Sequence, residues 1–185
     1  MSRGEGFAGR PVVWLNGAFG VGKTSVAAEL ARRRPTITFD PEVIGGGLWR
    51  MLPEDMLPDD YQDSALWRHL VREAVVALHR AYSRPVIVPM TLVVPEYFDE
   101  IVGGLRAQGV PVRHYVLGAA RETIEERLAG RPDTTDWTWW QVDRCLVALQ
   151  DRRFGLVVAT DGQTIEEVAD AIEADAYETA EAVPA

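Results

Sequence analysis

The chain has 185 residues, of which 47% are hydrophobic, and this composition favours one globular domain over a disordered chain. Its formal net charge of −9 disfavours non-specific binding to nucleic acid, because the phosphate backbone requires a basic surface. Cys145 is the single cysteine, which excludes an internal disulfide bond, and we interpret it as a small buried hydrophobic residue. The sequence predicts a cytoplasmic protein without an integral membrane segment.

Short apolar runs alternate with amphipathic stretches along the chain, and this pattern predicts alternating strands and helices. The predicted strands cover residues 12–15, 36–39, 86–90, 112–117 and 155–159. The predicted helices cover residues 24–34, 64–82, 97–108, 121–130, 136–151 and 164–174. We expect a mostly parallel sheet with helices on both faces, an α/β fold.

Three segments are expected to lack regular structure. Residues 1–10 are predicted to form a flexible leader, the glycines at 45–47 a flexible break, and residues 176–185 a frayed tail. A single domain would therefore span residues 11–175.

One motif predicts a binding site for a nucleoside triphosphate. Residues 17–24 match the phosphate-loop pattern G-x-x-x-x-G-K-[ST] completely. Lys23, the only lysine of the chain, can reach the β- and γ-phosphates, and the hydroxyl group of Thr24 can bind Mg²⁺. The predicted cofactors are therefore ATP and Mg²⁺. The predicted ATP-binding residues are Gly17, Ala18, Phe19, Gly20, Val21, Gly22, Lys23, Thr24 and Ser25.

Candidate acceptor-binding residues follow the second predicted strand. Asp40 could accept the proton of an acceptor hydroxyl or hold a water on Mg²⁺, or it could cap the next helix. We interpret Glu42 as a first-turn helix charge rather than a catalytic group. Arg50 and Trp67 lie in the segment that would recognise the acceptor, although core packing is the favoured interpretation of Trp67.

Two arginines could bind a transferring phosphoryl group. Arg127 and Arg131 are four residues apart and would share one helix face. They could clamp phosphate oxygens, or they could form a solvated face with nearby glutamates, which the spacing alone favours. The following stretch, residues 131–140, contains a proline and three tryptophans and could close over a substrate or anchor a helix to the core.

Several stretches together resemble one family. Trp14-Leu-Asn-Gly-Ala-Phe-Gly-Val-Gly-Lys-Thr is similar to the opening of the tunicamycin-resistance ATP-binding proteins, which are P-loop kinases. Phe39-Asp-Pro-Glu, Ile87-Val-Pro-Met-Thr and Gln141-Val-Asp-Arg-Cys agree in the same order. The resemblance implies a three-layer fold with a five-stranded parallel sheet in the order 2-3-1-4-5. It also implies a helical lid carrying Arg127 and Arg131, and resistance to a nucleoside antibiotic by phosphorylation or binding.

The third strand departs from many phosphate-loop proteins. It ends in Pro89-Met90-Thr91, without the acidic residue that commonly holds the metal. Mg²⁺ would then depend on Thr24, waters and Asp40. Two functions stay open: a kinase that phosphorylates a small nucleoside-like or antibiotic acceptor, and a module that binds ATP and sequesters the antibiotic without transfer. A nucleotide-hydrolysing switch is disfavoured, because the sequence contains no switch motif.

Overall fold

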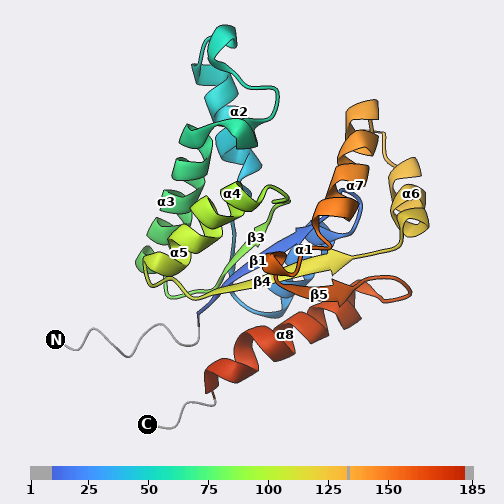
Figure 1. Ribbon diagram of the computed structural model, residues 1–185. Coiled ribbons are helices and arrows are strands. Elements are labelled where there is room, and N and C mark those ends of the chain that lie inside the picture. The colour runs from blue at the N-terminus through green and yellow to red at the C-terminus, as the bar shows by residue number, and fades with distance from the viewer. Residues whose placement is uncertain (1–9, 133, 182–185) are drawn as a thin grey trace, which may run out of the picture.

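Figure 1 shows the computed structural model, which describes residues 10–132 and 134–181. Five parallel strands form one sheet in the order β2-β3-β1-β4-β5, as predicted. The strands are β1 Val12–Gly17, β2 Ile37–Thr38, β3 Val86–Pro89, β4 Val112–Gly118 and β5 Leu156–Ala159. The predicted leader, apart from Arg10, and the last four residues of the predicted tail lie outside the described residues.

Helices connect the strands, and most of them lie at the positions that the sequence pattern indicates, whereas the helix over residues 42–51 was not predicted. They are α1 Lys23–Arg33, α2 Glu42–Met51, α3 Ala65–Ala81, α4 Pro95–Phe98, α5 Gly104–Ala107, α6 Arg121–Ala129, α7 Asp136–Ala148 and α8 Ile165–Glu181. A π-helical turn at Asp99–Gly103 joins α4 to α5, so the predicted helix over residues 97–108 is one continuous helical segment. Short 3₁₀ turns occur at Glu54–Met56, Tyr61–Asp63 and Arg152–Phe154.

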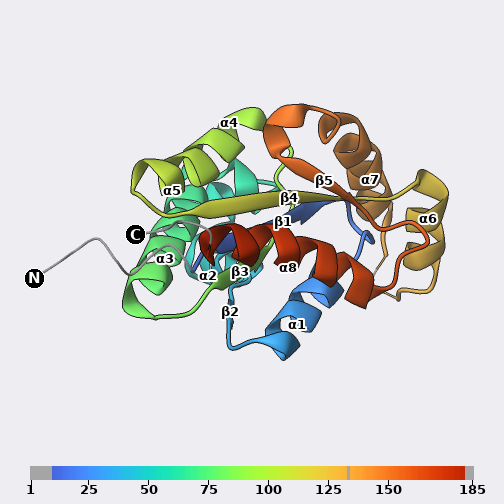
Figure 2. The same cartoon turned by 90° about the horizontal axis from the view of Figure 1, so that it is seen from below.

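The central strand β1 is completely buried because helices cover both faces of the sheet. Val13 and Leu15 pack with α1 and α8 on one face, whereas Val12 and Trp14 pack with α3, α4 and α5 on the other. Figure 2 shows α1 and α8 lying across the first face. This double burial explains the uninterrupted apolar run that predicted the strand.

Two predictions about irregular structure were wrong. Residues 45–47 belong to α2, and a Cβ atom at Gly45 would lie 2.8 Å from Tyr61, so the glycine allows close packing there. The predicted frayed tail is helical as far as Glu181. Tyr177 holds this end in place, because its ring is buried and the guanidinium carbon of Arg34 lies 3.8 Å from the ring centroid.

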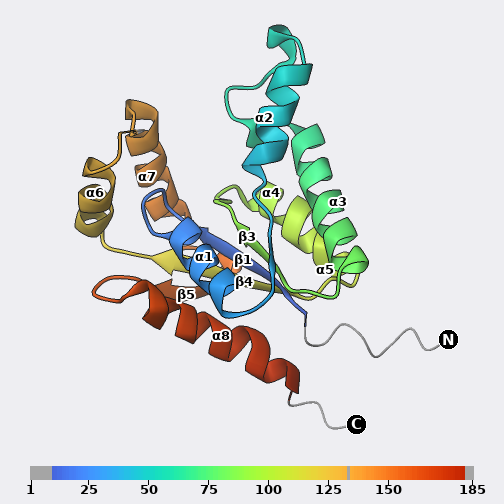
Figure 3. The same ribbon diagram turned by 180° about the vertical axis from the view of Figure 1, so that it is seen from behind.

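Two groups of helices extend from the same side of the sheet. The first group is α2 with α3, and the second is the lid, which we define as α6 and α7 (Figures 1 and 3). A third cluster of buried side chains, including Ile124, Leu128 and Val142, packs the lid beneath the phosphate loop. In the part of the chain that the structure describes, no helix is both long and apolar enough to cross a membrane.

Candidate ATP-binding and acceptor site

The phosphate loop curls between the end of β1 and the start of α1. Gly17, Gly20 and Gly22 have φ values of 143°, 79° and 107°, which side chains rarely adopt. A Cβ atom at Gly17 would lie 2.7 Å from the carbonyl oxygen of Leu117, and one at Gly20 would lie 2.8 Å from Leu128. Backbone conformation therefore favours glycine at all three positions, and lack of space also requires it at Gly17 and Gly20.

Lys23 lies at the first turn of α1, with its ammonium group folded back over the loop. The Nζ atom donates hydrogen bonds to the carbonyl oxygens of Gly17 and Ala18, at 2.8 and 2.9 Å. Burial lowers the pKa of Lys23 from 10.5 to about 8, because the charged form loses hydration. A bound anion would compensate for this lost hydration, so the ammonium group is placed to bind phosphate.

Two polar side chains that were not among the predicted site residues fix the loop to the segment that follows β3. The Thr91 hydroxyl donates a hydrogen bond to the carbonyl oxygen of Gly17 at 2.8 Å. The Asn16 side chain donates to the carbonyl oxygen of Leu92 and accepts from the amides of Leu92 and Gly17. Asn16 is a buried polar residue at the end of an apolar strand. A polar residue in such a position needs hydrogen-bond partners, and this is the signal in the sequence that could have identified it.

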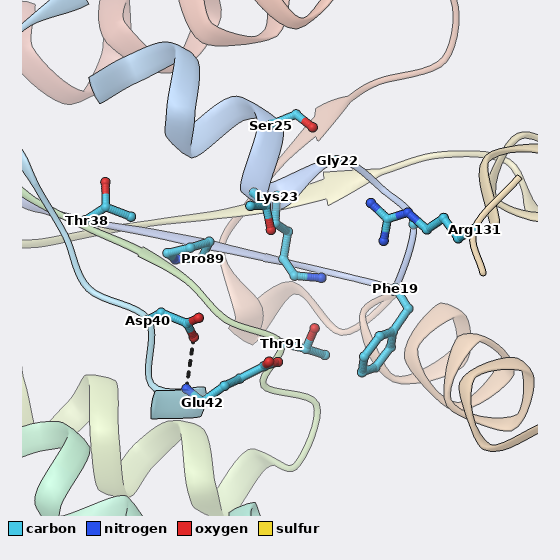
Figure 4. A pocket seen from close by; sticks show the side chains of 12 residues that line it. Phe19, Gly22, Lys23, Ser25, Thr38, Asp40, Glu42, Pro89, Thr91 and Arg131 are labelled. Carbon is cyan, nitrogen blue, oxygen red and sulfur yellow. Dashed lines mark hydrogen bonds between the residues drawn. The ribbon is translucent and has the colours of Figure 1, made fainter. Parts of the chain in front are cut away.

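A cavity of about 380 Å³ opens beside the phosphate loop. Figure 4 shows the Lys23 side chain extending into it, with Asp40 and Glu42 on the side of α2 and Arg131 on the side of the lid. Its lining residues are Phe19, Gly20, Gly22, Lys23, Thr24, Ser25, Thr38, Asp40, Glu42, Pro89, Thr91 and Arg131. Of the other predicted ATP-binding residues, Gly17 and Ala18 lie below this surface and Val21 lines a neighbouring cavity.

Asp40 stabilises the start of a helix, as one interpretation expected, and its role toward an acceptor or Mg²⁺ stays a prediction. Its Oδ1 atom accepts a hydrogen bond from the backbone amide of Glu42 at 2.9 Å, which stabilises the start of α2, and the side chain also lines the cavity. The interpretation of Glu42 as only a helix charge was incomplete, because this side chain lines the same cavity. The negative charge of Glu42 partly offsets the lowering of the Lys23 pKa.

The two lid arginines differ in one respect: only Arg131 lines the main cavity, whereas both line a second cavity beside it. Arg127 donates hydrogen bonds to the carbonyl and hydroxyl oxygens of Thr160, both at 3.0 Å, and to the carbonyl oxygen of Val21 at 3.2 Å. It therefore joins the phosphate loop to the loop after β5. Arg131 lines both the main cavity and a second cavity, which lies between the phosphate loop, Thr160 and α8.

Two predicted acceptor residues lie away from the cavity. Trp67 is completely buried in the core, and its indole nitrogen donates a hydrogen bond to the carbonyl oxygen of Pro41 at 3.1 Å. Its role is therefore to support the segment that carries Asp40, not to contact a ligand. Arg50 is exposed near the end of α2 and does not line the cavity. Cys145 is buried, as predicted.

Fold and phosphate loop together define a P-loop kinase-like domain. A family model described as an AAA domain matches residues 12–156, and the chain belongs to this family. It is 30% identical to the tunicamycin resistance protein of Deinococcus radiodurans, with a TM-score of 0.77 over 90% of this chain and 95% of that one. This similarity confirms the resemblance to the tunicamycin-resistance proteins.

Two further structures share the fold. A gluconokinase from Sinorhizobium meliloti is 18% identical, with a TM-score of 0.66 over 94% of this chain and 95% of that one. An APS kinase from Mycobacterium tuberculosis, in complex with AMPPNP and APS, is 17% identical, with a TM-score of 0.61 over 91% and 98%. A search of curated proteins gave no significant match.

Proposed function

We propose that the chain is a cytoplasmic ATP-dependent kinase that transfers the γ-phosphate to a hydroxyl group of a small nucleoside-like or antibiotic acceptor. The observation that carries this proposal is one cavity with two unlike walls. Lys23 and the phosphate loop form the wall that suits a triphosphate, whereas Asp40 and Glu42 form a wall that suits a hydroxyl group. The structural similarity to small-molecule kinases supports this reading.

Each side chain has a proposed role in the transfer. The ammonium group of Lys23 stabilises the transferring phosphoryl group, and Arg131 approaches the same group from the lid. Asp40 orients the acceptor hydroxyl and accepts its proton. Arg127 contacts the phosphate loop and Thr160, so its contribution is to hold the nucleotide-binding loops together.

Magnesium fits the residues of the cavity. Mg²⁺ usually keeps several waters and takes one or two carboxylates together with substrate phosphates. The hydroxyl of Thr24 lines the cavity and would bind the ion directly, whereas the carboxylate of Asp40, in the same lining, would hold one of its waters. Bound there, the ion would neutralise charge on the phosphates. Within the described residues, no cluster of three or more His, Cys, Asp or Glu side chains is arranged to hold a metal without a ligand.

The substitution Asp40→Asn tests the proposed phosphoryl transfer. Asn caps helices about as well as Asp, so Asp40→Asn should keep the fold and ATP binding while transfer falls by about 100-fold or more. ATP binding is measured by calorimetry, and the phosphorylated product by mass spectrometry after incubation with a panel of nucleosides, sugars and nucleoside antibiotics. Asp55→Asn, at an exposed residue far from the cavity lining, is the matched control. Unchanged transfer in Asp40→Asn would remove Asp40 from the mechanism.

A second candidate function is ATP-dependent sequestration of an antibiotic without transfer. The end of β3 favours it, because no metal-binding acid follows this strand and the hydroxyl of Thr91 is bonded to Gly17. Sequestration predicts that an acceptor binds tightly in the presence of Mg·ATP and that no phosphorylated product accumulates, even after long incubation.

A further inference from the structure

A narrow slot continues the main cavity away from the phosphate loop. Phe19, Glu42 and Thr91 line both spaces. Beyond them, Asp60, Tyr61 and Gln62 line the slot on the side of α2, and Trp137, Gln141 and Arg144 of α7 line it on the other side; we call these six residues the acceptor slot. Two apolar residues that follow β3, Met90 and Val93, complete the lining of the slot. Its volume of about 20 Å³ holds roughly one hydroxyl-sized group, since a single water needs about 10–15 Å³.

The acceptor slot is polar although it is enclosed. Gln141 is only 4% exposed, and its Oε1 atom accepts a hydrogen bond from Arg144 at 3.3 Å. The Oδ1 atom of Asp60 accepts a hydrogen bond from the backbone amide of Gln62 at 2.9 Å. Burial raises the pKa of Asp60 above its usual value, because the carboxylate has lost part of its hydration. Polar groups held in such an enclosed place are suited to recognise a polar group of a ligand.

Charge is distributed unevenly along the combined space. Lys23 and Arg131 lie at the phosphate loop, where a triphosphate would neutralise them. The remaining space is lined by three carboxylates, from Asp40, Glu42 and Asp60, and by one cation, Arg144, which already donates to Gln141. An acceptor with a carboxylate or phosphate of its own would therefore meet net negative charge.

Aromatic rings border the same space. The ring of Phe19 meets Trp137 edge to face, with centroids 5.5 Å apart, and Trp137 is 48% exposed. The flat surfaces of these rings can contact the apolar face of a sugar or a nucleobase without requiring charge.

We propose that the acceptor is an uncharged, hydroxyl-bearing molecule of the sugar or nucleoside class, and that it inserts one neutral hydrogen-bonding group into the acceptor slot. This inference rests on the proposed function and adds to it the charge of the acceptor. The carboxylates of Asp60 and Glu42 accept hydrogen bonds from the inserted group and from neighbouring hydroxyls, and they exclude anionic analogues.

Matched pairs of ligands test the inference. Calorimetric titrations with saturating Mg·AMPPNP use d-glucose against d-gluconate, and uridine against uridine 5′-monophosphate, which also separates the sugar from the nucleoside class. In at least one pair the neutral member should bind at least about ten-fold more tightly, which corresponds to about 1.4 kcal/mol. Tighter or equal binding of the anionic member in both pairs, or failure of both neutral members to bind, overturns the proposal.

Two substitutions test whether residues of the slot cause the preference for neutral over anionic ligands. Asp60→Asn and Glu42→Gln should each reduce the ratio of neutral to anionic affinity by about three-fold or more. Asp59→Asn, which neutralises the exposed neighbouring residue outside the slot, should leave the ratio unchanged. An unchanged ratio in both slot variants overturns the assignment. Binding of a neutral acceptor without any phosphorylated product would refute the proposed kinase activity but not this inference, whereas phosphorylation of an anionic acceptor would refute only the inference.

Discussion

At the scale of single residues, Lys23 lies in the phosphate loop, where burial makes its charged form less stable than in water. Its ammonium group is bonded to two main-chain carbonyls, and burial brings its pKa down to about 8. A lysine with an ordinary pKa stays charged at all physiological pH values, whereas this one loses its proton within the range in which proteins are commonly assayed. Nucleotide affinity should therefore depend on pH.

ATP affinity should fall as the pH rises from about 7 to about 9. The γ-phosphate is already ionised in this range, so a change in ATP affinity would come from a group of the protein. Below a pH of about 8 the ammonium form of Lys23 dominates, and above it the neutral amine does. We expect a decrease of up to about ten-fold, measured by calorimetry in buffers of different ionisation enthalpy, with proton uptake on binding. Lys23→Met should bind weakly and without this pH dependence. A flat profile in the unmodified protein would contradict the lowered pKa.

At the scale of elements, the end of β3 and the phosphate loop form one unit. The Thr91 hydroxyl bonds to the carbonyl oxygen of Gly17, which also accepts from Lys23. Because this oxygen lies at the first glycine of the loop, the bond fixes where the loop leaves β1. Thr91, which follows a strand that ends without the expected acid, therefore has a structural function in this chain.

Thr91→Val should weaken ATP binding by several-fold, since a hydrogen bond of this kind is worth about 1 kcal/mol. Valine keeps the volume of threonine but leaves the carbonyl oxygen with one partner fewer. Thr91→Ser keeps the hydroxyl group and serves as the control, which should bind ATP nearly as well as the unmodified chain. Equal affinity in the valine variant would show that Lys23 alone holds this carbonyl oxygen.

Elements with a strong periodic or compositional pattern could be predicted, and those that depend on distant contacts could not. The apolar run at residues 12–15 lies in β1, as the pattern indicates. The glycines of α2 were misread, because the ring of Tyr61 that packs on Gly45 is remote in sequence. The helical end at Tyr177 was missed for the same reason, since its support comes from Arg34.

In the candidate site too, residues within a local motif could be predicted, and residues brought together from distant segments could not. The phosphate loop is a contiguous motif, and its residues were identified from the sequence. The place of Asp40 at a strand end was also identified. The acceptor slot was not, because Asp60 and Gln141 come from segments about 80 residues apart and carry no motif. Trp67 was named as an acceptor candidate from its position in the chain, and its burial confirms core packing, the interpretation that the sequence analysis favoured.

At the scale of the whole molecule, α8 completes the layer that covers the sheet beside α1. Ile172 is fully buried in this layer, together with residues of β1 and β4. Arg33 of α1 forms ion pairs with Asp170 and Glu173 of α8, so apolar and charged contacts join the two helices. The C-terminal helix is therefore part of the core and not an appendage.

Ile172→Ala should lower the free energy of unfolding by about 2–5 kcal/mol, because it removes buried apolar volume and leaves a cavity. Chemical denaturation followed by circular dichroism measures the change. Val147→Ala, at a side chain that is 73% exposed, is the control and should change stability by no more than about 0.5 kcal/mol. A loss below about 1 kcal/mol for Ile172→Ala would show that α8 packs loosely.

The position of β1 at the centre of the sheet has a consequence for biosynthesis. This strand is made first, yet it pairs only with β3 and β4, and the bond that fixes the phosphate loop spans 74 residues of sequence. A nascent polypeptide that has left the ribosome only as far as α3 carries the full nucleotide motif without the neighbours that shape it. We therefore expect the phosphate loop to reach its folded shape only after the fourth strand has emerged.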